Sequence, residues 1–149
     1  MLASCSETPD HYTNQAPILG SAVMNVPGNN SCFQALRYAG AVEKAFAGIG
    51  YNANESGATV AANIGAINDA LNKCDANHTQ IATYLRGFVS FATAYLAYHY
   101  RADQSDIPQY LPVALRLFKE CAAGHDATVA KACEYHYNLA SAMMQQDSP

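Results

Sequence analysis

The stretch from His78 to Arg101 constrains the fold of this chain more than any other part of its sequence. No Asp, Glu, Lys or Arg lies between Arg86 and Arg101. Apolar residues recur there every three or four positions on two adjacent stripes, which is the period of an α-helix. The uncharged run is 14 residues long, whereas a helix that crosses a bilayer needs about 20 apolar residues. The pattern predicts a buried central helix in a helical bundle, with the following residues facing its neighbours: Ile81, Tyr84, Leu85, Phe88, Phe91, Ala92, Tyr95 and Tyr98.

Four further helices are predicted around the central one, and no strand. Apolar residues recur at helical spacing in each of them, and Asn, Ser, Asp, Gly and Pro mark the positions where each begins or ends. The predicted fold class is all-α, a five-helix bundle of antiparallel helical hairpins over residues 31–145, followed by a frayed polar tail. The expected helices run from Ser31 to Gly48, from Ser56 to Asn72, from Thr79 to Arg101, from Asp106 or Tyr110 to Gly124, and from Asp126 through Met143.

Four of the five cysteines lie symmetrically about two predicted hairpin turns. Cys32 and Cys74 are each 21 residues from position 53, in the first turn, and Cys121 and Cys133 are each six residues from position 127, beside the second. Residues equidistant from the turn of an antiparallel hairpin lie level with one another, within reach of a disulfide if their side chains face each other. The bundle is therefore expected to be braced by the disulfides Cys32–Cys74 and Cys121–Cys133.

The second pair of cysteines also permits a metal site. Cys121 and His125 are separated by three residues, and Cys133 and His136 by two, so two thiolates and two imidazoles gather on one hairpin, as a tetrahedral zinc site requires. Five cysteines in one small domain are more typical of an oxidising compartment, where the thiols pair. The sequence thus favours disulfides, and neither a metal nor another cofactor is expected.

The N-terminal residues indicate a lipid anchor. Leu2-Ala3-Ser4-Cys5 resembles the lipobox of bacterial lipoproteins, in which the cysteine is acylated and becomes the mature N-terminus. The resemblance implies that Cys5 carries the lipid. The residue after it is Ser6, and in this the sequence resembles lipoproteins that are released to the outer membrane. Residues 6–30 are rich in Pro, Asn and Ser and have no helical period, so residues 1–30 are predicted to be a lipobox remnant and a flexible tether.

The tripeptide Tyr-His-Tyr occurs twice, at residues 98–100 and 135–137. Aromatic clusters can bind sugars, cations or nucleobases. Three consecutive helical residues point in three directions, however, so no single pocket is expected from either triplet. We interpret these side chains as core and boundary aromatics whose polar tips reach the surface.

Residues 93–143 resemble the helix-turn-helix pattern of tetratricopeptide-like repeats. The resemblance covers about one and a half repeats, and it implies stacked helical hairpins and a role in binding other proteins. The positions that carry it are Leu96, Ala97, Tyr100, Ala114, Phe118, Cys121, Asn138, Leu139 and Ala140.

Composition and motifs exclude some classes of function. The net charge is −4, and the eight Lys and Arg are scattered singly, so no basic stripe is available for nucleic acid. The sequence has no Gly-rich phosphate loop, no nucleophile elbow and no paired carboxylates that would indicate catalysis. We therefore expect a protein that is not an enzyme.

These patterns together predict a periplasmic, lipid-anchored protein, at the outer membrane, that acts by binding another protein. The first expectation is an accessory or assembly factor of a cell-envelope secretion machine. One alternative is an immunity or exclusion protein that neutralises an incoming effector, which would require a concentrated acidic or protruding surface. Another is a small-molecule binder lined by the tyrosines.

Overall fold

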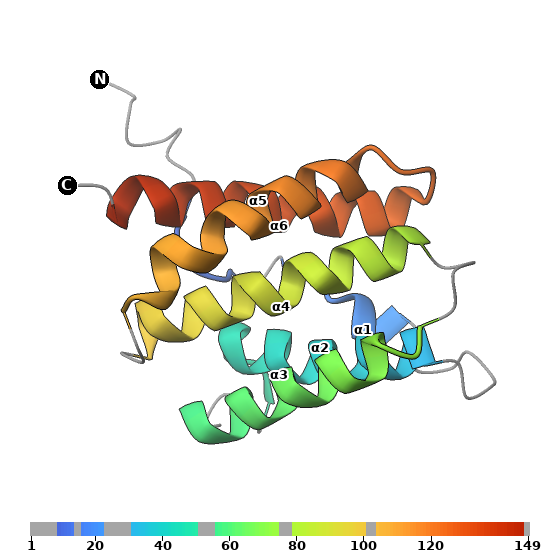
Figure 1. The fold of residues 1–149 in the computed structure, drawn as a ribbon, viewed down its shortest axis with the longest axis horizontal. Coiled ribbons are helices and arrows are strands. Elements are labelled where there is room, and N and C mark those ends of the chain that lie inside the picture. The colour runs from blue at the N-terminus through green and yellow to red at the C-terminus, as the bar shows by residue number, and fades with distance from the viewer. Residues whose placement is uncertain are drawn as a thin grey trace.

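A computed structural model describes residues 9–13, 16–22, 31–50, 56–74, 79–100 and 104–147. Within these residues the chain is all-α, with five long helices, one short helix and no strand, so the predicted five-helix bundle is confirmed (Figure 1). The predicted frayed tail is wrong for residues 145–147, which continue the last helix. The elements are α1 (Leu19–Ala22), α2 (Ser31–Ala47), α3 (Gly57–Leu71), α4 (Thr79–His99), α5 (Asp106–Ala122) and α6 (Ala127–Asp147).

Local side-chain contacts explain where several helices begin and end. Ser56 caps α3, where its hydroxyl accepts a hydrogen bond from the backbone N–H of Thr59 at 3.2 Å. Asp126 caps α6 in the same way, with its carboxylate 3.0 Å from the backbone nitrogen of Thr128. Both contacts satisfy N–H groups that have no partner inside the helix. Gly48 follows α2 with φ of 71°, a left-handed conformation that glycine adopts without strain.

The long helices form two disulfide-linked hairpins with α4 between them. The structure joins Cys32 to Cys74 across the α2–α3 hairpin, with 4.7 Å between their Cα atoms. It joins Cys121 to Cys133 across the α5–α6 hairpin, with a Cα separation of 5.9 Å. The pairing predicted from the symmetry of the turns is therefore confirmed.

Helix α4 is the centre of the core, as its apolar pattern predicts. It contacts all four other long helices, and in Figure 1 it runs between the α5–α6 hairpin above and the α2–α3 hairpin below. Phe88, Phe91 and Ala92 are fully buried. Helix α5 starts at Asp106, the earlier of its two predicted starts, and consequently contains Pro112.

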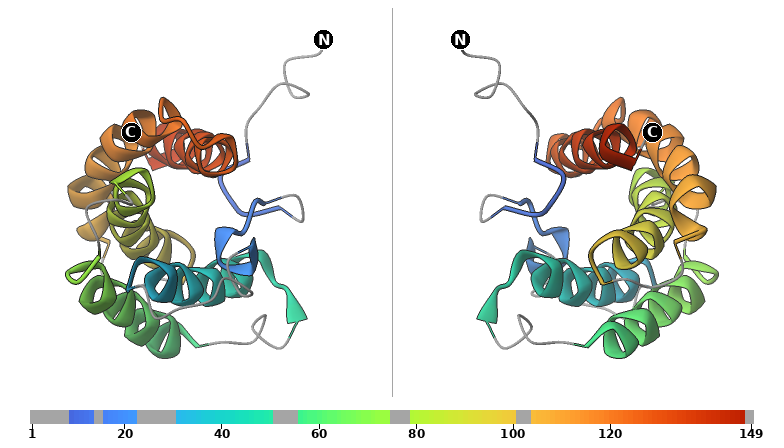
Figure 2. Two further views of the ribbon diagram at one scale, coloured as in Figure 1. Left: turned by 90° about the vertical axis from the view of Figure 1, so that its right-hand side faces the viewer. Right: turned by 90° about the vertical axis from the view of Figure 1, so that its left-hand side faces the viewer.

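The long helices form an open ring when viewed along their axes, and residues 9–13 and 16–22 lie in the opening between α6 and α2 (Figure 2). Tyr12 and Leu19 are buried, with 6% and 4% of their surface exposed. Helix α1 meets α2 backbone to backbone, because a Cβ built on Gly20 would lie 2.7 Å from the Cα of Gly40. The flexible tether predicted for residues 6–30 is therefore wrong for residues 9–13 and 16–22; positions 1–8, 14–15 and 23–30 lie outside the described residues.

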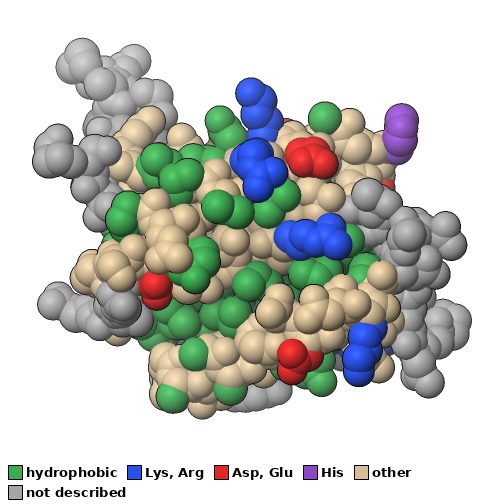
Figure 3. Space-filling model, in the orientation of Figure 1, with side chains coloured by type: hydrophobic (Ala, Val, Ile, Leu, Met, Phe, Trp, Pro, Cys, Tyr) green, Lys and Arg blue, Asp and Glu red, His purple; other side chains and the backbone are tan. Residues whose placement is uncertain are grey.

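The surface carries charges of both signs. On the face shown in Figure 3, the Asp and Glu side chains stand singly, and the Lys and Arg side chains are spread among polar and apolar ones. Among the described residues, no helix combines the length and the apolar character that spanning a bilayer requires.

Candidate functional site

The most distinctive site in the structure is an aromatic enclosure around Tyr12. We use the name Tyr12 site for the five rings that surround this side chain, which come from three different helices. Their centroids lie 5.4 to 5.9 Å from that of Tyr12. Tilted and edge-on contacts at this separation are favourable between aromatic rings. The rings belong to Phe46 of α2, Phe91 and Tyr95 of α4, and Tyr135 and His136 of α6.

A directed hydrogen bond closes the inner end of the Tyr12 site. Nδ1 of His136 lies 2.7 Å from the backbone carbonyl of Ala132. Because a carbonyl only accepts, Nδ1 carries a hydrogen. Burial lowers the pKa of His136 to about 4, so the ring is neutral at pH 7 and Nε2 is an acceptor. The hydroxyl of Tyr12 lies 2.6 Å from Nε2 and therefore donates to it.

Side chains of α4 and α6 also hold the main chain beside Tyr12. The Tyr95 hydroxyl accepts a hydrogen bond from the backbone N–H of Tyr12 at 3.2 Å. The Tyr135 hydroxyl accepts one from the backbone N–H of Thr13 at 3.1 Å. On the other side, Nε2–H of His99 donates to the carbonyl of Asp10 at 2.9 Å. Residues 10–13 have no helical structure, so side chains satisfy the backbone groups that a helix would pair internally.

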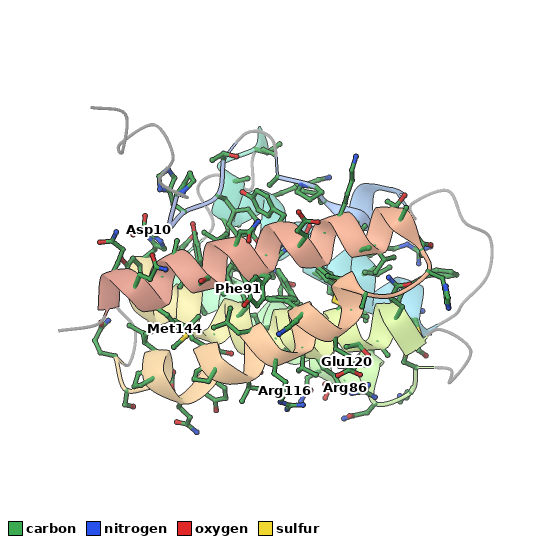
Figure 4. The ribbon with its side chains drawn as sticks, turned by 90° about the horizontal axis from the view of Figure 1, so that it is seen from above. Asp10, Arg86, Phe91, Arg116, Glu120 and Met144 are labelled. Carbon is green, nitrogen blue, oxygen red and sulfur yellow. A yellow bond between two sulfur atoms is a disulfide. The ribbon has the colours of Figure 1, made fainter. Side chains whose placement is uncertain are left out.

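The carboxylate of Asp10 adds a charged contact at the rim. It accepts a hydrogen bond from the Tyr98 hydroxyl at 2.7 Å, and this bond is the main reason that the pKa of Asp10 is lowered. In Figure 4, Asp10 lies on the opposite side of α6 from Arg86, Arg116 and Glu120, and Phe91 lies beneath the helix. The contacts of residues 10–13 thus run from a half-buried acidic rim to a buried aromatic interior.

A second polar group is buried close to the Tyr12 site. Glu43 of α2 is fully buried, and one of its carboxyl oxygens accepts a hydrogen bond from the Tyr84 hydroxyl. The other, Oε2, has no hydrogen-bond partner among the described residues. Burial raises the pKa of Glu43 to about 8, so its carboxyl group is mostly protonated at neutral pH. Desolvation, together with this carboxyl group, raises the pKa of the Tyr12 phenol.

The two Tyr-His-Tyr triplets converge on one segment, an arrangement that the sequence analysis does not predict. Two members of each triplet contact residues 10–13: Tyr98 and His99 from α4, and Tyr135 and His136 from α6. Although neighbouring residues on one helix point in different directions, the two helices flank the same segment. The prediction that polar tips reach the surface is wrong for His136, which is fully buried.

The other predicted site residues are placed as follows. Cys5 lies outside the described residues. Cys121 and Cys133 are joined to each other, His125 is exposed, and His136 bonds Tyr12, so the alternative zinc set is not assembled. No group of three or more His, Cys, Asp or Glu side chains within the described ranges is placed to hold a metal ion.

No family model, curated protein or solved structure matches this chain.

Proposed function

We propose that this chain is a lipid-anchored envelope protein that binds another protein through an extended segment at the Tyr12 site. In this proposal Cys5 carries the anchor, and the protein serves as an accessory or assembly factor of a secretion machine. The tetratricopeptide-like pattern of residues 93–143 agrees with a protein-binding role, because it covers the last third of α4 and most of α6, the helices that hold residues 10–13.

The observation that carries the proposal is the way in which tyrosine hydroxyls hold main-chain groups. Tyr95 and Tyr135 each accept a hydrogen bond from a backbone N–H of the segment. Main-chain contacts of this kind supply affinity for an extended peptide, while pockets for individual side chains supply specificity. Tyrosine suits such surfaces because it offers a large, rigid contact area and a polar tip at a low entropic cost.

The immunity alternative would gain support from a gathered acidic surface. On the face shown in Figure 3, acidic side chains stand singly. The small-molecule alternative would use the same aromatic rings, but main-chain contacts to residues 10–13 are better matched by a peptide than by a compact ligand. We therefore favour the protein-binding function.

Photo-crosslinking in the native host tests where a partner binds. A benzophenone amino acid is placed at Asn138, which is exposed on α6 one turn after Tyr135, and, as a matched control, at Ala61, which is exposed on α3. We expect a discrete crosslinked protein from position 138 and none from position 61. Equal crosslinking from both positions, or none from either, would contradict the proposal that a partner protein binds at the Tyr12 site in cells.

The anchor is tested separately by metabolic labelling. The natural signal peptide is restored, cells are fed a palmitate analogue, and membranes are fractionated. Wild-type protein should carry the label and sediment with the outer membrane, whereas Cys5→Ala should do neither. Equal labelling of the two proteins would end the proposal that Cys5 is acylated.

A further inference from the structure

The contacts at the Tyr12 site define which segments it can hold. His136 Nε2 is buried and presents an acceptor at the inner end of the site, and the Tyr12 hydroxyl is its partner at 2.6 Å. A phenyl ring without a hydroxyl would fill the same space but leave this acceptor unpaired. A site that is built to bond a hydroxyl discriminates strongly against a ligand that lacks it. The site therefore recognises a phenol rather than an aromatic ring in general.

The remaining contacts add one more requirement. Two main-chain N–H groups and one main-chain carbonyl are held by Tyr95, Tyr135 and His99, and any residue can supply such groups. The Asp10 side chain is held by the Tyr98 hydroxyl. His11, between them, is exposed, and its hydrogen bond is to Asp10 of the same segment. The set of contacts therefore specifies an acid, any residue, and a tyrosine.

The docking of the resident segment depends on contacts that lie outside the Tyr12 site. Helix α1 packs against α2 where Gly20 faces Gly40, and a Cβ built on Gly20 would lie 2.5 Å from the carbonyl oxygen of Leu36. The methyl group of an alanine at position 20 would meet backbone atoms, which cannot move aside as a flexible side chain can. Helix α1 would therefore have to shift. Occupancy of the site by residues 10–13 can thus be weakened without altering any of the five rings.

We propose that the Tyr12 site is a recognition site for a tyrosine side chain that a partner protein presents in an extended Asp-x-Tyr segment, and that residues 10–13 occupy the site until such a segment replaces them. This inference rests on the proposed protein-binding function and names the ligand of its site. The resident segment lowers the apparent affinity for a partner, because that affinity is the intrinsic one multiplied by the fraction of time in which the segment leaves the site free.

Peptide binding to the full-length protein tests the inference. The probe is a fluorescent peptide with the sequence of residues 6–16, SETPDHYTNQA, and its affinity is measured by anisotropy for wild type, Gly20→Ala and Gly65→Ala. Gly65 is a matched control, because it is exposed on α3 and a Cβ there would meet nothing within 4 Å. We expect Gly20→Ala to bind the peptide about tenfold more tightly than the other two proteins.

Two altered peptides test the chemistry of recognition. Replacing the tyrosine by phenylalanine should weaken binding to Gly20→Ala about tenfold or more, and replacing the aspartate by asparagine should weaken it less. Equal affinity for the tyrosine and phenylalanine peptides would overturn phenol recognition. A concentration-dependent dimer of Gly20→Ala in light scattering, without peptide binding, would overturn the partner segment and identify a second copy of this chain as the occupant.

A small-molecule measurement keeps the inference testable if Gly20→Ala does not fold. Tyr12→Gly removes the resident phenol, and 4-methylphenol or toluene is then added to the full-length variant. Thermal stabilisation by 4-methylphenol and not by toluene is expected, and equal stabilisation by both would overturn phenol recognition.

Discrimination between the peptides without a crosslink from position 138 would reject the proposed cellular function alone. A crosslink without discrimination would reject the Asp-x-Tyr ligand alone.

Discussion

The interface between α4 and α5 and the interface between the helices and residues 10–13 are both buried, but they are held in different ways. At the first, Gly87 of α4 lets the Phe118 ring approach closely, since a Cβ there would lie 3.0 Å from two ring carbons. At the second, aromatic rings are combined with hydrogen bonds to the phenol of Tyr12 and to the main chain. Apolar contacts are non-directional and stabilise roughly in proportion to buried area.

The difference concerns specificity as well as strength. An apolar interface tolerates another side chain of similar volume at a small cost. Buried polar groups such as His136 and Glu43 tolerate little, because an unpaired one is costly. The α4–α5 interface is thus suited to holding the fold together, and the interface with residues 10–13 is suited to selecting one segment.

The largest expected effect is at the apolar interface. Phe118→Ala should lower the free energy of unfolding by about 3–5 kcal/mol, because it removes a fully buried ring and leaves a cavity. Chemical denaturation measures the change. The exposed residue Lys73 gives the control, and Lys73→Ala should change stability by no more than about 0.5 kcal/mol. If both variants unfold at the same denaturant concentration, the α4–α5 interface does not hold the fold.

Removing a disulfide should have a somewhat smaller effect and leave both interfaces in place. Each bond lies within one hairpin, so neither joins α4 to α5 nor holds residues 10–13. Replacing either pair by alanines should cost about 2–4 kcal/mol. The Cys32–Cys74 bond spans 42 residues and the Cys121–Cys133 bond spans 12. Because the longer loop restricts the unfolded chain more, loss of Cys32–Cys74 should lower the free energy of unfolding by about 1 kcal/mol more than loss of the other bond.

Stability against denaturant and helical circular dichroism, measured on the two double variants, check this prediction. Loss of the helical spectrum in either variant would show that the interfaces depend on the covalent bonds.

The pH dependence of stability should come from the polar interface and its neighbour Glu43. Burial lowers the pKa of His136 from 6.5 to about 4, so the unfolded chain binds the proton more tightly and stability falls as pH falls through this window. Burial raises the pKa of Glu43 from 4.5 to about 8. The folded chain therefore keeps this proton longer, and stability falls as pH rises from 4.5 to 8.

The effects of His136 and Glu43 on stability oppose each other between pH 4.5 and 6.5, and the effect of Glu43 acts alone between pH 6.5 and 8. Wild-type stability should therefore decline above pH 6.5 by at most about 1.4 kcal/mol per pH unit. Glu43→Gln should abolish this decline and reveal a loss of stability below pH 6.5. Denaturation curves across this range measure both effects, and identical profiles for the two proteins would exclude Glu43 as their cause.

The smallest expected effect is at a glycine that belongs to neither interface. Gly65 is exposed within α3, and a Cβ there would meet nothing within 4 Å. Gly65→Ala should raise the free energy of unfolding by about 0.5–1 kcal/mol, because alanine loses less conformational freedom in a helix. Thermal denaturation measures the gain. A loss of stability would mean that the outer surface of α3 has contacts of its own.

The helices and their disulfides could be predicted from the sequence because their determinants are local. Helical period, caps such as Ser56 and Asp126, and the glycine at the end of α2 act within a few residues of the positions that they define. The cysteine pairs follow from two predicted turns and chain symmetry. Burial of Glu43 does not follow in this way, because only the packing of α4 against α2 supplies the Tyr84 hydroxyl as its partner.

The Tyr12 site was decided by the tertiary structure alone. The bond between Tyr12 and His136 joins residues that are 124 positions apart, and no periodicity or spacing links them. The two Tyr-His-Tyr triplets were a signal, but a triplet on one helix does not reveal that a second helix faces the same segment. Residues 10–13 have the polar, proline-flanked sequence of a tether, and they are ordered by partners that the fold brings together.

The sequence by itself determined the helices and the covalent bonds between them, because those depend on neighbouring residues or on symmetry about a turn. The assembled ring of helices determined which segment fills its opening.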